Sequence, residues 1–259
     1  EMLQTWFWHN GLLLNPDKSE VIFFGTRQRL HSTNLPTSIS IAGNVISVSS
    51  TVKILGVKLD STLSFSDHMN DVVRGCNYHM RALRHIRRYM SRDVARSIAF
   101  SIVGSRLDYC NCLLYDMGTG LTNKLQRIQN NLARIVCDVQ FKRRRGQRSS
   151  QELLQELHWL PVASRINFKV ALLCYKAYRL HEPAYLQTLT QPYVPTRCLR
   201  SSNCDKLIES KIHLKTAARR FSVAAPKVWN SLSQTTRQAE TVGAFKSALK
   251  TELMSARIV

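Results

Sequence analysis

Arginines at helical spacing are the side chains of this sequence best suited to a chemical task. Arg74, Arg81, Arg84 and Arg88 follow one another at intervals of seven, three and four residues, which places them along one flank of a helix. Guanidinium groups in such a row neutralise phosphates and release counterions, which gives affinity for a nucleic-acid backbone without reading its sequence. The spacing therefore predicts a surface that contacts phosphates.

Other basic residues extend this pattern. Lys124 and Arg127 lie beside the apolar stripe of a later predicted helix. The densest positive charge comes next, in Lys142, Arg143, Arg144, Arg145 and Arg148. Because like charges so close together repel one another, this run is expected to be an exposed loop. Three interpretations of the loop stay open: a contact with phosphates, a nuclear-localisation signal, or a solvated connection.

Two ring side chains, His85 and Tyr89, alternate with the arginines of the first row. They could stack on bases or sugars of a bound strand. The alternative is that they are simply partly buried against the rest of the protein, as helical Tyr and His residues often are. Sequence spacing does not separate the two interpretations.

The charge balance points to a polyanionic partner. The 259 residues contain 37 Lys and Arg against 17 Asp and Glu, a net charge of +20 with a pI near 10.1. Residues 1–60 contribute only +1 of this, so the positive charge belongs to the remainder. A soluble basic protein of another kind, such as a ribosome-associated one, is the alternative. No apolar run reaches the roughly 20 residues of a membrane-spanning helix, so no membrane partner is expected.

Cysteines and catalytic motifs restrict the chemistry further. Seven cysteines, an odd number, fit reduced thiols in the cytoplasm or nucleus better than a disulfide framework. Their spacing, as in Cys110 and Cys112 or Cys198 and Cys204, does not match a zinc site, so no metal is expected. The sequence also contains no GxSxG, Walker-type glycine loop or HExxH pattern.

The first 60 residues are expected to form a small antiparallel sheet behind a helix. A helical run ends at Gly11, a turn follows at Asn15, and residues 21–24 are predicted to form a fully buried strand. A hairpin is predicted from residues 38–41 and 45–48 around a Gly43-Asn44 turn, and residues 52–59 are predicted to form another strand with Gly56 in its middle.

Almost everything after this sheet is predicted to be helical. Apolar residues at spacings of three and four predict helices at 66–86, 121–135, 163–178 and 242–254. A helix at 92–115, apolar nearly all round, is expected to be the central buried one. Trp159 and Trp229 are expected to anchor the core. The fold class is therefore α+β and mostly α-helical.

Several motifs, in order, resemble the end of a reverse transcriptase from LINE-type (non-LTR) retrotransposons, of a jockey-like clade. The matching residues are Asn10-Gly11-Leu12, Asn15, Lys18 and Glu20; Leu55-Gly56-Val57 and Asp60; the run from Ser105 to Asn111; Leu125-Gln126 and Gln129-Asn130; the run from Leu157 to Pro161; Leu199 to Ser202; and Ala225-Pro226 with Trp229-Asn230. These matches span nearly the whole chain. The sequence therefore resembles a C-terminal piece of such an enzyme, entered in the middle of a helix.

The resemblance implies three parts and two further sites. Residues 1–62 would be the end of the palm, 63–148 a thumb-like helical domain with a basic loop, and 149–259 a basic helical extension. Lys18 matches a palm lysine whose ammonium could neutralise the leaving phosphate or donate a proton, or it is a solvated turn lysine. Leu55, Gly56 and Val57 match the primer grip, where a glycine lets the backbone approach the primer end, or they are ordinary strand residues that pack against the helix of residues 1–14.

The residues that would bind catalytic metal ions are missing. Such polymerases hold two Mg²⁺ ions with aspartates, among them an adjacent Asp-Asp pair, and this chain contains no such pair. Its isolated aspartates, Asp17, Asp60, Asp67, Asp71 and Asp108, are explained as turn, cap or surface residues. The chain alone is therefore not expected to polymerise or to hold a cofactor, and Mg²⁺ is expected only in an intact enzyme.

The expected function is to grip the template–primer duplex and element RNA, with RNA, DNA and the upstream palm and fingers segment as partners. The rival interpretation is a degenerate or co-opted RNA-binding protein without enzymatic activity. A third is an interaction scaffold whose charge is incidental.

Overall fold

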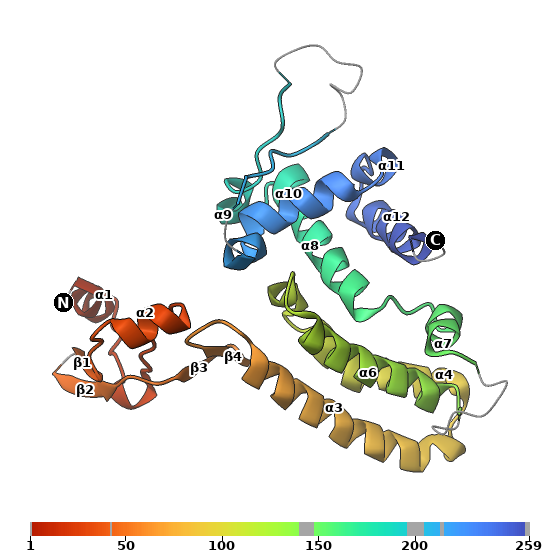
Figure 1. Cartoon of the computed structure of the whole chain (residues 1–259), viewed down its shortest axis with the longest axis horizontal. Helices are drawn as coiled ribbons and strands as arrows, with labels where there is room; N and C mark the ends of the chain where they lie inside the picture. The colour runs from red at the N-terminus through yellow and green to blue at the C-terminus, as the bar shows by residue number, and fades with distance from the viewer. Residues whose placement is uncertain (1, 42, 140–147, 196–204, 213–214, 257–259) are drawn as a thin grey trace. The chain divides into compact units, whose positions relative to one another are not determined.

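The computed structural model describes residues 2–41, 43–139, 148–195, 205–212 and 215–256 (Figure 1). The chain divides into two compact units, residues 1–71 and 72–259, which are described separately. The described residues are mostly helical and include two small antiparallel sheets, so the predicted α+β, mostly helical class is confirmed. The three-part division predicted from the sequence stays a prediction.

The first unit begins with short helices whose ends follow from local sequence. Helix α1, Met2–His9, is followed by Gly11 with a φ of 68°, a conformation that glycine adopts without strain. The predicted turn at Asn15 is a 3₁₀ segment, Pro16–Lys18, and the Asn15 side chain accepts a hydrogen bond from the backbone of Asp17. Helix α2, Arg27–Ser32, begins after Thr26, whose hydroxyl accepts from the Arg29 backbone.

Two separate hairpins make up the sheets of the first unit. Strands β1, Ser38–Ile41, and β2, Asn44–Ser47, are antiparallel, which confirms the first predicted hairpin. Strands β3, Thr51–Ile54, and β4, Val57–Asp60, form the second. The prediction of one continuous strand at 52–59 was wrong. Leu55 and Gly56 both have positive φ, 47° and 83°, and two such residues make the tight turn whose twist matches paired strands.

The prediction of a buried strand at residues 21–24 was also wrong. Only Val21 makes a bridge, with Val48, and Phe24 is 50% exposed. An apolar run favours burial of its side chains, but a strand also needs a neighbouring strand to pair with. Here β1 pairs with β2 and β3 pairs with β4, in two separate sheets.

Asp60 organises the turn that joins β4 to helix α3, Ser66–Ile86. Its carboxylate accepts hydrogen bonds from the backbone and hydroxyl groups of Thr62 and Ser64 and from the Phe65 backbone, at 2.6 to 3.1 Å. Burial raises the pKa of Asp60, but these hydrogen bonds outweigh burial and hold the pKa below its usual range. The interpretation of Asp60 as a turn residue is therefore confirmed.

Replacing Asp60 with Asn should destabilise the first unit by about 1–3 kcal/mol, because the amide cannot accept the same set of bonds. The pKa of Asp60 is lower in the folded state than in the unfolded state. The contribution of its carboxylate to the free energy of unfolding is therefore complete above the unfolded pKa of about 3.9 and is lost as the pH falls through the folded pKa. Hydrogen exchange of the β3 and β4 amides measures the loss. Asp17→Asn, at an exposed position, is the control and should stay within about 0.5 kcal/mol; equal losses in both variants would contradict the assignment.

The second unit is a layered set of helices, ordered as Figure 1 shows. After α3 come a 3₁₀ turn, Arg87–Tyr89, and α4, Arg92–Ala99. A π-helical segment, Phe100–Gly104, continues into α5, Ser105–Asp108, and a 3₁₀ turn, Asn111–Leu114. Helices α6, Thr119–Val136, α7, Ser150–Glu156, and α8, Val162–Arg179, follow. The remaining elements are α9, Ala184–Gln187, a 3₁₀ turn, Lys215–Arg219, α10, Phe221–Ser231, α11, Gln234–Arg237, and α12, Val242–Ser255.

The predicted central buried helix at 92–115 is neither continuous nor fully buried. It passes through the π-helical segment and breaks at Cys110, which has a φ of 50°. Val94 and Phe100 are 49% and 47% exposed. Only one face, with Ala95, Ala99 and Val103, is buried. A helix that is apolar all round is buried only if neighbours cover every side, whereas here α6 packs on α4, and α8 packs on α5 and the 3₁₀ turn that follows it.

Helix α8 joins the two parts of the core. It contacts α6 and also α10 and α12 (Figure 1). In the second part the rings of Tyr175, Trp229 and Phe245 stack, and all three are at most 1% exposed. Trp159 is 8% exposed. Both tryptophans therefore anchor the core as predicted.

Among the described helices, none combines the length and the apolar character needed to cross a bilayer.

Candidate nucleic-acid interface

The predicted arginine row lies on the exposed side of one long helix and the turn after it. Arg74, Arg81 and Arg84 project from α3, Arg88 follows in the 3₁₀ turn, and all four are exposed. The opposite side of α3 buries Cys76, Met80 and Leu83 at 0%, 5% and 4% exposure. With a rise of 1.5 Å per residue, the ten residues from Arg74 to Arg84 cover about 15 Å of the helix axis. The amphipathic pattern thus fixes which side of α3 faces solvent.

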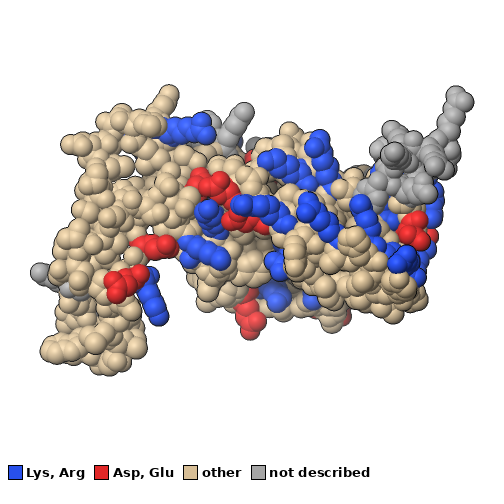
Figure 2. Space-filling model, turned by 90° about the horizontal axis from the view of Figure 1, so that it is seen from below, with Lys and Arg blue, Asp and Glu red and all other residues tan. Residues whose placement is uncertain are grey.

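Asp67 and Asp71 stand at the start of α3, but no acidic residue follows them in the helix or in the turn after it. Residues 72–89 contain five arginines and two histidines but no Asp or Glu. Figure 2 shows the same imbalance over one face of the helical unit, where Lys and Arg side chains outnumber acidic ones. This local excess of positive charge favours a polyanionic partner.

Exposed rings accompany the arginines. Tyr89 is 72% exposed, with the Arg88 guanidinium 4.7 Å from its ring centroid, and His85 is also exposed. The interpretation of this pair as partly buried was therefore wrong. Tyr78 is also 72% exposed and was not identified from the sequence. It comes four residues after Arg74, and that spacing places two residues on the same side of a helix. These rings can stack on unpaired bases.

Arg87, in the middle of the basic run, has a structural role instead. Its Nε donates to the carbonyls of Ile135 and Val136 at 3.1 Å, and its two Nη atoms donate to Val136 and Met90, each at 2.8 Å. The first two carbonyls belong to the C-terminal end of α6, where a cation also meets the negative end of the helix dipole. Arg87 therefore ties the end of α3 to the end of α6.

Arg87→Ala should destabilise the second unit by about 2 kcal/mol, because several charge-assisted hydrogen bonds to buried carbonyls are lost together. Arg88→Ala, the matched neighbour, should change stability by no more than about 0.5 kcal/mol. Urea unfolding followed by circular dichroism compares the two. Similar values for both variants would show that the Arg87 contacts contribute nothing to stability.

A further guanidinium joins the row from another helix. Arg106 of α5 is exposed, and its Nη1 lies 3.6 Å from the position that a Cβ at Gly75 would occupy. Burial raises the pKa of the neighbouring Cys76 thiol to about 11, with Arg106 acting in the opposite direction. Arg106 was not predicted as a site residue, because nothing in its spacing shows that α5 packs beside Arg74.

The other predicted basic residues have separate places. Lys124 and Arg127 are exposed on α6, a different helix of the same unit. The predicted site residues Lys142, Arg143, Arg144 and Arg145 lie outside the residues that the structure describes. Arg148 forms an ion pair with Glu156, which also binds Arg92, so this cation of the run is at least partly neutralised.

The predicted sites of the first unit are distributed over two elements. Lys18 is exposed at the end of the 3₁₀ segment Pro16–Lys18. Leu55 and Gly56 form the tip of the β3–β4 hairpin, and Leu55 is 86% exposed whereas Val57 is 5% exposed. Leu55 therefore does not pack as an ordinary strand residue, which was one of its two interpretations.

Several motif residues that carry the family resemblance build the helical scaffold. Gln129 is 1% exposed and donates from Nε2 to the Leu160 carbonyl at 2.7 Å, and Gln126 accepts from the Val162 backbone at 3.0 Å. These two glutamines hold the segment between α7 and α8 against α6. Asn230 likewise accepts from and donates to the Leu207 backbone, each at 2.9 Å.

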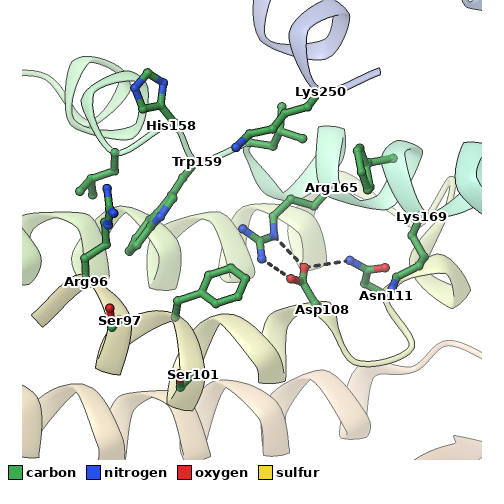
Figure 3. Close-up of a pocket in the computed structure, with 14 residues that line it drawn as sticks. Arg96, Ser97, Ser101, Asp108, Asn111, His158, Trp159, Arg165, Lys169 and Lys250 are labelled. Atoms are coloured by element: carbon green, nitrogen blue, oxygen red, sulfur yellow. Dashed lines mark hydrogen bonds and ion pairs between the residues drawn. The ribbon is translucent and has the colours of Figure 1, made fainter. Parts of the chain in front are cut away.

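Asp108 has a role beyond those predicted for the aspartates. It lies within the second unit and pairs with Arg165, whose side chain is only 12% exposed, and with the Asn111 amide (Figure 3). The Asp108 side chain is 32% exposed, so it lies partly at the surface as predicted, but it also forms an ion pair that joins α5 to α8. Across the part of the chain that is described, His, Cys, Asp and Glu side chains form no group of three that could hold a metal ion.

Comparison of the whole chain with family models, curated proteins and solved structures found no match in any of the three, so the family resemblance rests on the sequence motifs alone.

Proposed function

We propose that the second unit binds the phosphate backbone of a template–primer duplex through Arg74, Arg81, Arg84 and Arg88. The observation that carries this proposal is the exposed flank of α3, where residues 72–89 contain five arginines and no Asp or Glu. Phosphates of duplex DNA provide one negative charge per about 1.7 Å of axis, so a row of guanidinium groups covering about 15 Å of helix meets several of them. This binding is independent of base sequence, as a polymerase grip must be.

The wider proposal follows the family resemblance. In it, the chain is the C-terminal portion of a retrotransposon RNA-directed DNA polymerase that acts inside the cell, in the cytoplasm or nucleus. Lys124, Arg127 and the basic run 142–145 extend the contact with nucleic acid, and Lys18 and the hairpin tip at Leu55 contribute near the primer end. Catalysis belongs to the upstream palm and fingers segment, because this chain lacks the Asp-Asp pair.

The salt dependence of binding tests the grip. An RNA–DNA hybrid titrated with the full chain and followed by fluorescence anisotropy should bind with nanomolar-to-micromolar affinity. Four phosphate contacts should make the slope of log K against log salt about −3 to −4. A slope shallower than about −1, or equal affinity for heparin at every salt concentration, would favour an interaction scaffold with incidental charge.

A second candidate is a co-opted RNA-binding protein without a role in polymerisation. The exposed rings of Tyr78 and Tyr89 favour it, because they can stack on the unpaired bases of single-stranded RNA. Titration with single-stranded RNA of the same length separates the candidates. Tighter binding of the hybrid supports the template–primer grip, whereas tighter binding of the single strand supports the rival.

A further inference from the structure

A cavity of about 840 Å³ lies within the second unit, away from the exposed flank of α3. Its walls come from α4 and the π-helical segment, the link between α7 and α8, and helices α8 and α12 (Figure 3). This volume is in the range of sites that hold small organic ligands. The proposed grip does not use it, although residues of two motifs, among them Asp108, Asn111 and Trp159, line it.

The cavity is lined by more positive than negative charge. Four cations line it: Arg96, Arg165, Lys169 and Lys250. Its one carboxylate, Asp108, already accepts from Arg165 Nε at 2.7 Å. Arg96 also has the 88% exposed Asp93 at 4.0 Å, a surface pair that water screens strongly. Because Asp108 pairs with Arg165, the cations left for an entering anion are Arg96, Lys169 and Lys250.

Aromatic side chains line the same cavity. Phe100 is 47% exposed, and the Arg165 guanidinium lies 5.7 Å from its ring centroid. Phe100 and Ser101 come from the π-helical segment, a helix irregularity that is frequent at functional sites. Trp159 forms part of the wall and is 8% exposed. A planar ring system can stack on the exposed ring of Phe100, next to the cations.

One buried polar group at the cavity lacks a partner. Asn111 is 2% exposed, and its amide nitrogen donates to Asp108 at 3.3 Å. Its side-chain oxygen is buried and accepts no hydrogen bond from the described residues. The oxygen is too enclosed for a molecule in the cavity to reach it in this conformation, so the binding surface consists of the cations and the exposed ring.

We propose that this cavity binds a nucleotide, with its phosphate held by Arg96 and Lys250 and its base stacked on Phe100. A nucleotide combines the two features that suit these walls: an anionic group for the cations and a flat ring system for the exposed face of Phe100. A carboxylate peptide or an inorganic anion would meet the cations but leave the aromatic wall unused. The nucleotide is either free or the 5′-phosphorylated end of a strand.

Isothermal titration of the full chain tests the proposal with adenosine 5′-monophosphate, adenosine and inorganic phosphate. The monophosphate should bind at least about ten-fold more tightly than either fragment. Lys250→Glu and Arg96→Glu, both at exposed positions on the rim, should each weaken it at least about ten-fold. Lys246→Glu, the same change on the same helix but outside the cavity, should leave it unchanged.

Two further measurements distinguish a free nucleotide from a strand end, and this cavity from the arginine row of α3. A short RNA with a 5′-phosphate that binds more tightly than both its 5′-hydroxyl form and the free monophosphate identifies a strand end; the reverse order identifies a free nucleotide. Arg81→Glu/Arg84→Glu/Arg88→Glu should keep monophosphate binding, so failure of the duplex grip would leave this site intact. Absence of monophosphate binding at millimolar concentration, equal binding of inorganic phosphate, or no effect of Lys250→Glu and Arg96→Glu would overturn the proposal.

Discussion

Arg81→Glu/Arg84→Glu/Arg88→Glu is expected to weaken binding of an RNA–DNA hybrid by at least about 100-fold at 0.1 M salt. Each arginine that contacts a phosphate contributes close to one released counterion, and each glutamate adds repulsion to the loss. The three residues are exposed, so the variant should keep the circular dichroism and melting temperature of the parent chain. Anisotropy titrations over a range of salt concentrations measure the effect, and the slope of log K against log salt should fall by about 3.

A matched control distinguishes binding by the arginine row from a general effect of net charge. Lys176→Glu/Lys227→Glu/Lys246→Glu changes the net charge by the same amount at exposed positions of α8, α10 and α12. It should weaken hybrid binding several-fold at most, through the general field of the protein. If both triple variants lose the same affinity, or if the α3 variant is folded and loses none, the arginine row is not the grip.

Trp229→Ala is expected to destabilise the second unit by about 3–5 kcal/mol, the largest effect on stability of any substitution considered. Trp229 is fully buried and stacks on Phe245 at a centroid distance of 5.9 Å. Its indole N–H donates to the Asp205 carbonyl at 2.7 Å. The substitution leaves a large cavity between α8, α10 and α12 and also an unsatisfied carbonyl.

Two variants calibrate this result in urea unfolding. Trp229→Phe keeps most of the apolar volume but loses the indole donor, so it should cost less than Trp229→Ala. Tyr185→Ala, at a 72% exposed position, should change stability by no more than about 0.5 kcal/mol. A Trp229→Ala loss below about 1 kcal/mol would mean that this aromatic cluster does not hold the helices together.

Arg87 and Arg88 are neighbours in one basic run but have different roles, one in stability and one at the proposed binding surface. Arg88 is exposed beside Tyr89, whereas Arg87 binds carbonyls at the end of α6. Arg88 can contact a partner because Arg87 fixes the end of α3. A surface that binds a stiff duplex benefits from this rigidity, since less conformational entropy is lost on binding.

Periodic features of the chain could be predicted without coordinates. The stripe at Cys76, Met80 and Leu83 determined both that α3 is a helix and that its arginines face solvent. The same reasoning predicted α6, α8 and α12, the first hairpin and the two buried tryptophans. Periodicity succeeds here because one face of each element is buried and the other is not, and that difference is recorded in the order of residues.

The tertiary structure decided everything that depends on which element lies next to which. It made residues 52–59 a hairpin and left residues 21–24 without a partner strand. It placed Arg106 beside Gly75, turned Arg87 inward, and joined Asp108 to Arg165 across 57 residues to form the wall of a cavity. Sequence spacing reports how residues lie along one element, whereas pairing and burial depend on contacts between elements that are far apart in the chain.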